Sequence, residues 1–176
     1  MKITLNKYQQ LMATAVQLGN IDISGPAATG KTHFAAHWAA EKVEMYKDHP
    51  DGADVVLQVE NLRVGGYKLL GAFYGALSVG RESPIRQLQG RHYPYHQIGN
   101  VTVHLIRGDQ WANLGPHNRP VFFVQDDVYS WEDGACQDLP TGWRGIRVIK
   151  TPWNEKEFCL DIKPADGGGL PKHNEL

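Results

Sequence analysis

Two groups of residues in this chain have the types and spacing needed to act on a phosphate ester. The first fits the pattern G-x-x-x-x-G-K-[ST] at every required position and reads Gly25-Pro26-Ala27-Ala28-Thr29-Gly30-Lys31-Thr32. The two glycines let the backbone curl so that successive N–H groups point inward at phosphate oxygens. Lys31 places a positive charge against the β- and γ-phosphates, and the Thr32 hydroxyl can ligate Mg²⁺. We therefore expect a triphosphate site here, with Lys31 facing solvent when no ligand is bound.

The second group is the acidic pair Asp126-Asp127, which ends an apolar run that begins at Val121. Buried parallel strands are continuous apolar runs, and ligands lie at their carboxyl ends. We expect Asp126 to lie beside Thr32 and to hold Mg²⁺ through water, and Asp127 to polarise the attacking water. An acidic turn after an ordinary core strand is the alternative interpretation.

The elements that must position these residues alternate along the chain. Apolar residues at helical spacing predict helices, and short apolar runs predict strands. The predicted helices cover residues 8–18, 31–46 and 67–77. The predicted strands cover residues 21–24, 55–59, 101–106, 121–127, 146–152 and, at an edge, 157–162. This order predicts an α/β three-layer domain with a mainly parallel sheet over residues 1–164. Residues 165–176 are expected to form a flexible tail.

Composition bounds the setting of this domain. The 176 residues include 41% hydrophobic and 21% charged residues, which is ordinary for one globular domain. The formal net charge of -1 gives no global attraction to nucleic acid. Two cysteines without a C-x-x-C pair, no signal peptide and no apolar run long enough for a bilayer favour a cytoplasmic protein without a membrane partner. Pro94 separates His92 from His96, so we interpret both as ordinary loop histidines.

The start of the chain adds a resemblance to a known family. The segment Leu5-Asn6-Lys7-Tyr8-Gln9, shortly upstream of the phosphate-loop pattern, resembles the Q-motif of superfamily 1 helicases. With the Walker A and Walker B patterns, the chain resembles the N-terminal RecA-like ATPase lobe of that family over residues 5–151. The resemblance implies that the Gln9 amide pairs with adenine and selects ATP, although Gln10 is a neighbouring candidate. It also implies that Asp127 stands where the family usually carries Glu.

These observations predict a P-loop ATPase that binds ATP and hydrolyses it with Mg²⁺, in a nucleic-acid-related process of a phage or mobile element. Because a second lobe is missing, the resemblance implies that turnover needs a homo-oligomer or a second ATPase partner. Residues 80–100 are predicted to form a long exposed loop, in which the stretch from Arg81 to Tyr95 combines arginines with tyrosines. This combination suits single-stranded nucleic acid, a phosphate-closing lid or a subunit contact, and a solvated loop without any ligand is the alternative interpretation. The alternative functions are a small-molecule or nucleotide kinase, and a nucleotide-dependent interaction module with little turnover.

Overall fold

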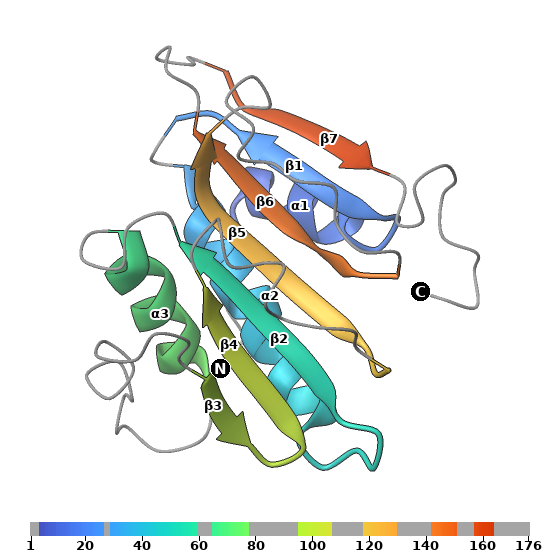
Figure 1. Cartoon of the computed structure of the whole chain (residues 1–176). Coiled ribbons are helices and arrows are strands. Elements are labelled where there is room, and N and C mark those ends of the chain that lie inside the picture. Colours follow the sequence, from blue (N-terminus) through green and yellow to red (C-terminus); the bar gives the residue numbers. More distant parts are fainter. Residues whose placement is uncertain are drawn as a thin grey trace.

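A computed structural model describes residues 4–26, 29–59, 65–77, 95–106, 118–129, 142–150 and 157–163 of the chain. Helices and strands alternate in the first half of the chain, and the described elements after the third helix are all strands (Figure 1). The elements are α1 (Lys7–Ala15), β1 (Asn20–Ser24), α2 (Lys31–Tyr46), β2 (Ala53–Val59), α3 (Gly65–Ala76), β3 (Tyr95–Ile98), β4 (Val101–Ile106), β5 (Val121–Tyr129), β6 (Arg144–Lys150) and β7 (Cys159–Lys163). The chain is therefore an α/β protein, as its sequence predicts. No described helix is long and apolar enough to cross a membrane.

The described strands form one sheet in the order β3-β4-β2-β5-β6-β1-β7. The five central strands, from β4 to β1, pair in parallel, and the edge strands β3 and β7 pair antiparallel to their neighbours. Because the central strands run the same way, their carboxyl ends meet at one edge of the sheet, where α/β proteins bind ligands. Strand β6 lies between β1, which leads into the phosphate loop, and β5, which carries the acidic pair.

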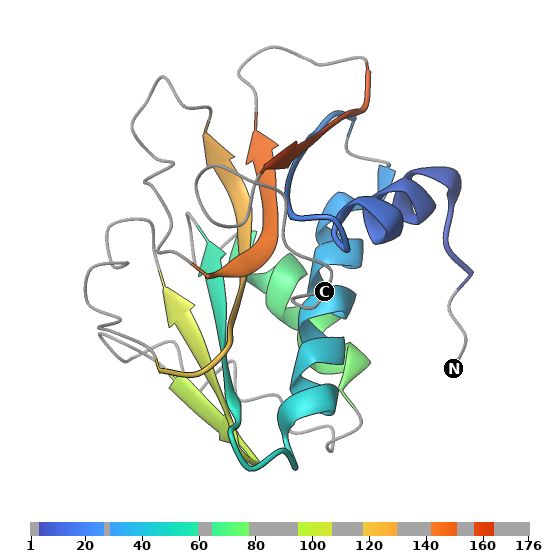
Figure 2. The same ribbon diagram turned by 90° about the vertical axis from the view of Figure 1, so that its right-hand side faces the viewer.

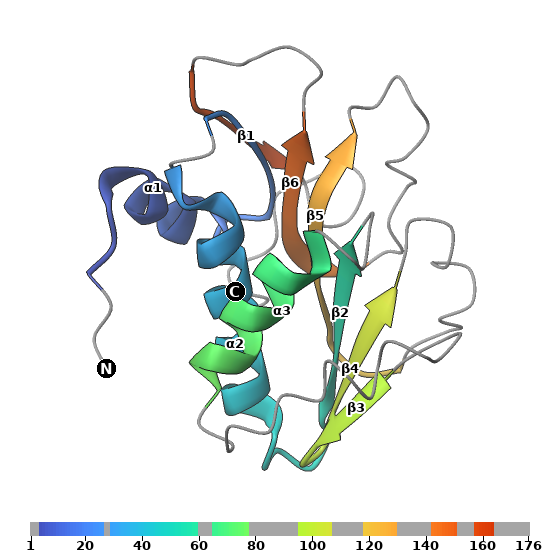
Figure 3. The ribbon, with the colours of Figure 1, turned by 90° about the vertical axis from the view of Figure 1, so that its left-hand side faces the viewer.

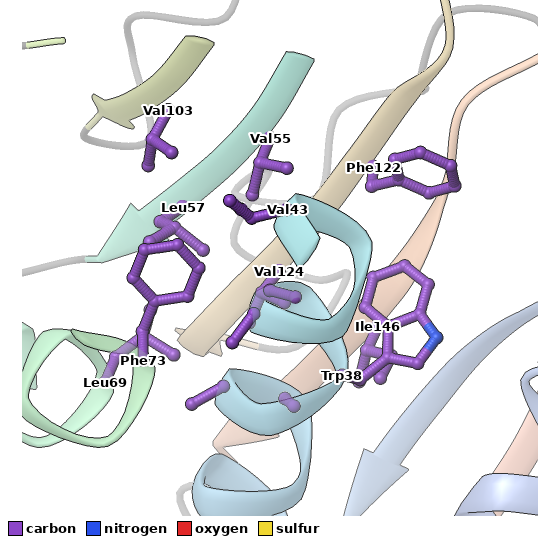
Figure 4. Close-up of a cluster of buried hydrophobic side chains, with 14 of the residues drawn as sticks. Trp38, Val43, Val55, Leu57, Leu69, Phe73, Val103, Phe122, Val124 and Ile146 are labelled. Atoms are coloured by element: carbon purple, nitrogen blue, oxygen red, sulfur yellow. The ribbon is translucent and has the colours of Figure 1, made fainter. Parts of the chain in front are cut away.

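The three described helices lie on the same face of the sheet (Figures 2 and 3). Alternate residues of the strands point to this face and pack against α2 and α3, because side chains alternate along a strand. The close-up in Figure 4 shows Phe73 of α3 and Trp38 of α2 among aliphatic side chains of the strands. Val55, Leu57, Val124 and Ile146 in this cluster are fully buried, so this interface is the main core of the protein. A helical layer on the other face, which a three-layer fold requires, is not among the described elements.

The second face of the sheet carries a smaller apolar cluster and a row of polar side chains. The row crosses five neighbouring strands in register and consists of Asp161, Asp22, Arg147, Gln125 and Gln58. Asp22 and Arg147 are each only 5% exposed, and both glutamines are buried. The Gln125 amide nitrogen donates to Gln58 Oε1 at 2.8 Å. Buried polar groups are costly unless they are bonded, so this row restricts the register of its strands.

Most element boundaries agree with the sequence predictions to within two or three residues, and residues 31–46 and 101–106 agree fully. Two predictions are wrong. Residues 95–98 form strand β3 rather than part of a loop, and the turn at Gly99, with φ of 55°, joins β3 to β4. Strand β5 does not end at the acidic pair but continues to Tyr129. His96 accordingly lies in a strand, with its Nδ1 3.2 Å from the Tyr74 hydroxyl, and the predicted tail 165–176 lies outside the described residues.

Candidate nucleotide-binding site

The phosphate-loop pattern lies between β1 and α2, at the carboxyl edge of the parallel strands. Its two glycines adopt backbone conformations that other residues rarely reach, with φ of 132° at Gly25 and 78° at Gly30. A Cβ on Gly25 would lie 2.8 Å from the Cα of Phe158, so the close approach of the chain before β7 also requires glycine. Gly30 precedes α2, which has no side-chain cap and no acidic residue in its first turn. The free N–H groups at this end of a 16-residue helix favour an anion.

Lys31 points back into the loop and not into solvent, which corrects the expectation from the sequence. Its ammonium donates to the carbonyl oxygens of Gly25 at 2.8 Å and Pro26 at 2.7 Å, and to the Thr29 hydroxyl at 3.1 Å. The residue is 8% exposed. The loop's own oxygens therefore surround the positive charge at the place where the motif requires a phosphate. A phosphate that enters the loop replaces oxygen ligands that the ammonium already has.

Thr32 and Asp126 are brought together as the sequence predicts, although they are 94 positions apart. The Thr32 hydroxyl donates to Asp126 Oδ1 at 2.9 Å, and Asp126 is 2% exposed. The pairing of β5 with β6 shifts by one residue between Gln125 and Val128, so that both residues of the acidic pair lie opposite one residue of β6. Such β-bulges redirect a side chain and are common beside active sites. The sequence contains no signal for this bulge beyond the acidic pair itself.

The Asn6–Gln9 turn of α1 is bonded to the loop backbone. These two side chains form a capping box, in which Asn6 accepts from the Gln9 N–H at 2.9 Å and Gln9 Oε1 accepts from the Asn6 N–H at 3.1 Å. Asn6 Nδ2 also donates to the Thr29 carbonyl at 3.3 Å, and Gln9 Nε2 to the Gly30 carbonyl at 3.4 Å. Both ends of the buried Gln9 amide therefore have protein partners. An adenine edge would have to replace these bonds to be recognised as the resemblance implies.

Strand β1, which leads into the loop, is held by a buried ion pair. The Arg147 guanidinium of β6 donates to both carboxylate oxygens of Asp22, at 2.7 and 3.0 Å. Asn20, at the start of β1, accepts from the Gly145 N–H at 2.9 Å and donates to the Trp143 carbonyl at 3.2 Å. These bonds fix β1 against β6 and therefore set the distance between the loop and the acidic pair. The sequence alone gives no sign that Asp22 and Arg147 pair, because partners 125 positions apart carry no local pattern.

The residues present fit a hydrated Mg²⁺ ion. Among the described residues, no three His, Cys, Asp or Glu side chains gather to form a metal site of their own. Mg²⁺ does not need such a cage, because it usually keeps several waters and uses one or two carboxylates together with substrate phosphates. The Thr32 hydroxyl and the Asp126 carboxylate supply oxygen ligands of that kind.

Several predicted site residues lie outside what the structure describes. Ala27 and Ala28, the side chain of Asp127 and residues 78–94 of the predicted basic and aromatic loop are among them, whereas Tyr95 is in β3 and 54% exposed. No protein-family model, no curated protein and no solved structure matches the chain. The resemblance to superfamily 1 helicases therefore remains a prediction, and the site's geometry carries the functional argument.

Proposed function

We propose that this chain is a RecA-like P-loop ATPase that binds ATP with Mg²⁺ and hydrolyses it in a nucleic-acid-related process. The observation that carries the proposal is the hydrogen bond between Thr32 of the phosphate loop and Asp126 of β5. A loop that only reversed the chain direction would not need a buried carboxylate beside its last residue. It would also not need the bulge in β5 at the position of that carboxylate.

Each residue has a separate task in this proposal. The N–H groups at the start of α2 bind the phosphates, and Lys31 neutralises the charge between the β- and γ-phosphates. Thr32 and Asp126 hold the metal ion, which when bound withdraws charge from the phosphate oxygens. Asp127 orients the attacking water, a role that follows from the family resemblance. A second copy of the chain, or another ATPase, supplies the arginine that stabilises the transition state.

Phosphate release from ATP tests the proposal. Purified protein is assayed with and without Mg²⁺, alone and with single-stranded DNA, single-stranded RNA or a panel of nucleoside monophosphates, and Lys31→Ala is the inactive control. Mg²⁺-dependent release that nucleic acid stimulates and Lys31→Ala lacks is the expected result. Transfer of phosphate to a monophosphate would replace the ATPase with a kinase. Failure of the wild type to bind Mg·ATP would overturn the assignment of the phosphate loop.

A further inference from the structure

Two histidines lie one turn apart on α2, and the first of them directly follows Thr32 of the phosphate loop. His33 and His37 have ring centroids 4.3 Å apart and ring planes inclined by 52°. His33 is exposed and His37 is half-buried. Residues four apart lie on the same face of a helix, so both imidazoles extend from the same face of α2. A pair of histidines with this spacing on one helix face is a known arrangement for binding Zn²⁺.

The separation of the rings agrees with chelation of a single ion. With metal–nitrogen distances near 2.0–2.1 Å, a tetrahedral angle at the metal places the two ring centroids about 5.2 Å apart, and the right angle of square-planar coordination places them about 4.5 Å apart. The observed 4.3 Å differs from the second of these values by less than a small side-chain rotation provides. The two rings are therefore close enough for one ion to bind a nitrogen of each after rotation of the side chains.

The environment also favours the neutral imidazole, which is the form that binds metal. Burial, and then the neighbouring His33, lower the pKa of His37 from its usual 6.5. Glu41 follows one helical turn after His37 and lines the same groove. Its carboxylate adds negative charge near the pair, while Lys42, which also lines the groove, adds a positive charge.

A groove between α1, α2 and α3 leaves room for the remaining ligands of such an ion. It encloses a cavity of about 660 Å³, and both histidines line it together with Gln9, Phe34, Trp38 and Glu41. Water, or a small ligand in the groove, can therefore occupy the coordination positions that the two imidazoles leave open.

We propose that His33 and His37 form a chelating site for one divalent transition-metal ion of the Ni²⁺, Cu²⁺ or Zn²⁺ class. Imidazole nitrogens suit these ions, whereas Mg²⁺ prefers oxygen ligands, so the site is chemically distinct from the one at Thr32 and Asp126. Affinity follows the general order in which Cu²⁺ binds more tightly than Ni²⁺ or Zn²⁺.

Calorimetric titration of the tag-free protein with NiCl₂, and separately with CuCl₂, tests the proposal. The variants are His33→Gln, His37→Gln and their combination, and the matched control is His49→Gln, which removes an exposed histidine that follows α2. Far-UV circular dichroism and thermal melting without metal establish that each variant is folded. The Cu²⁺ form is also examined by electron paramagnetic resonance, which reports how many nitrogen atoms bind the ion.

The wild type and His49→Gln are expected to bind one equivalent of Ni²⁺ with the same affinity. His33→Gln and His37→Gln should each bind Ni²⁺ at least tenfold more weakly, because only one of the two chelating imidazoles remains. The Cu²⁺ spectrum should report two nitrogen ligands in the wild type and one in either single variant. The proposal would be overturned if the double variant bound Ni²⁺ as tightly as the wild type, or if His49→Gln lost Ni²⁺ binding. Neither result depends on whether the protein hydrolyses ATP.

Discussion

Replacing Arg147 with methionine should destabilise the protein strongly, because it removes two hydrogen bonds and a balancing positive charge from a buried carboxylate. Asp22 and Arg147 are each 5% exposed and share two hydrogen bonds of 2.7 and 3.0 Å. Removing one member of such a pair costs about 3–5 kcal/mol, whereas replacing both members with apolar residues is often neutral. Since a chain of this length loses about 2–4 °C of melting temperature per kcal/mol, Arg147→Met should lower Tm by about 6–20 °C.

Urea denaturation of three variants measures this effect. The single variants Arg147→Met and Asp22→Leu should both lower the free energy of unfolding, and the double variant Asp22→Leu/Arg147→Met should recover most of that loss. Lys68→Met serves as a matched control for the loss of a positive charge at an exposed position, with a cost within about 0.5 kcal/mol. If Arg147→Met costs less than about 1 kcal/mol, or if the two single effects simply add in the double variant, the ion pair does not hold β1 as we infer.

Four further predictions concern the loop and its surroundings. Lys31→Ala should abolish tight Mg·ATP binding in a titration with a fluorescent ATP analogue, and should lower the stability of the free protein by about 1–2 kcal/mol, because two loop carbonyls lose a donor. Asp126→Asn should weaken the Mg²⁺ dependence of nucleotide binding, whereas Asp127→Asn should spare binding and slow phosphate release; equal loss of binding in both would contradict this division. In competition binding, Gln9→Ala should lower the affinities for ATP, GTP and tripolyphosphate by a similar factor, because the Gln9 amide is bonded to the loop. A loss of affinity confined to ATP would instead support adenine recognition. Burial lowers the pKa of His96 from 6.5, so the contribution of His96 to stability should be complete above pH 6.5 and lost as the pH falls through the lowered pKa. In urea denaturation, His96→Gln should reduce the pH dependence of the unfolding free energy in that range.

The sequence predicted the parts of the fold and site that depend on local pattern. The phosphate loop and α2 were recognisable because glycine, lysine and helical periodicity are close together in the chain. The proximity of Thr32 and Asp126 was predictable because the carboxyl ends of parallel strands meet at one edge. The second prediction needed only that both strands be parallel members of one sheet, and not their order in it.

Features that depend on distant partners were not predictable in this way. The pairing of Asp22 with Arg147 requires the strand order, in which β6 lies next to β1. The orientation of Lys31 depends on where the loop carbonyls point, which the motif does not specify. Strand β3 was missed because it is a short edge strand with polar residues and little apolar alternation.

The position of β1 in the sheet has a consequence for synthesis of the chain. Its two neighbours, β6 and β7, are translated last among the described strands, and β6 begins about 120 residues after β1 ends. At about 5–20 residues per second, the ribosome needs roughly 6–24 s to make that interval. During this time Ile21 and Ile23, which are fully buried in the finished protein, have no strand to pair with. A nascent chain that stalls before β6 therefore carries the complete phosphate-loop sequence without the two strands that hold β1 in the sheet, and should be a substrate for chaperones rather than a nucleotide-binding protein.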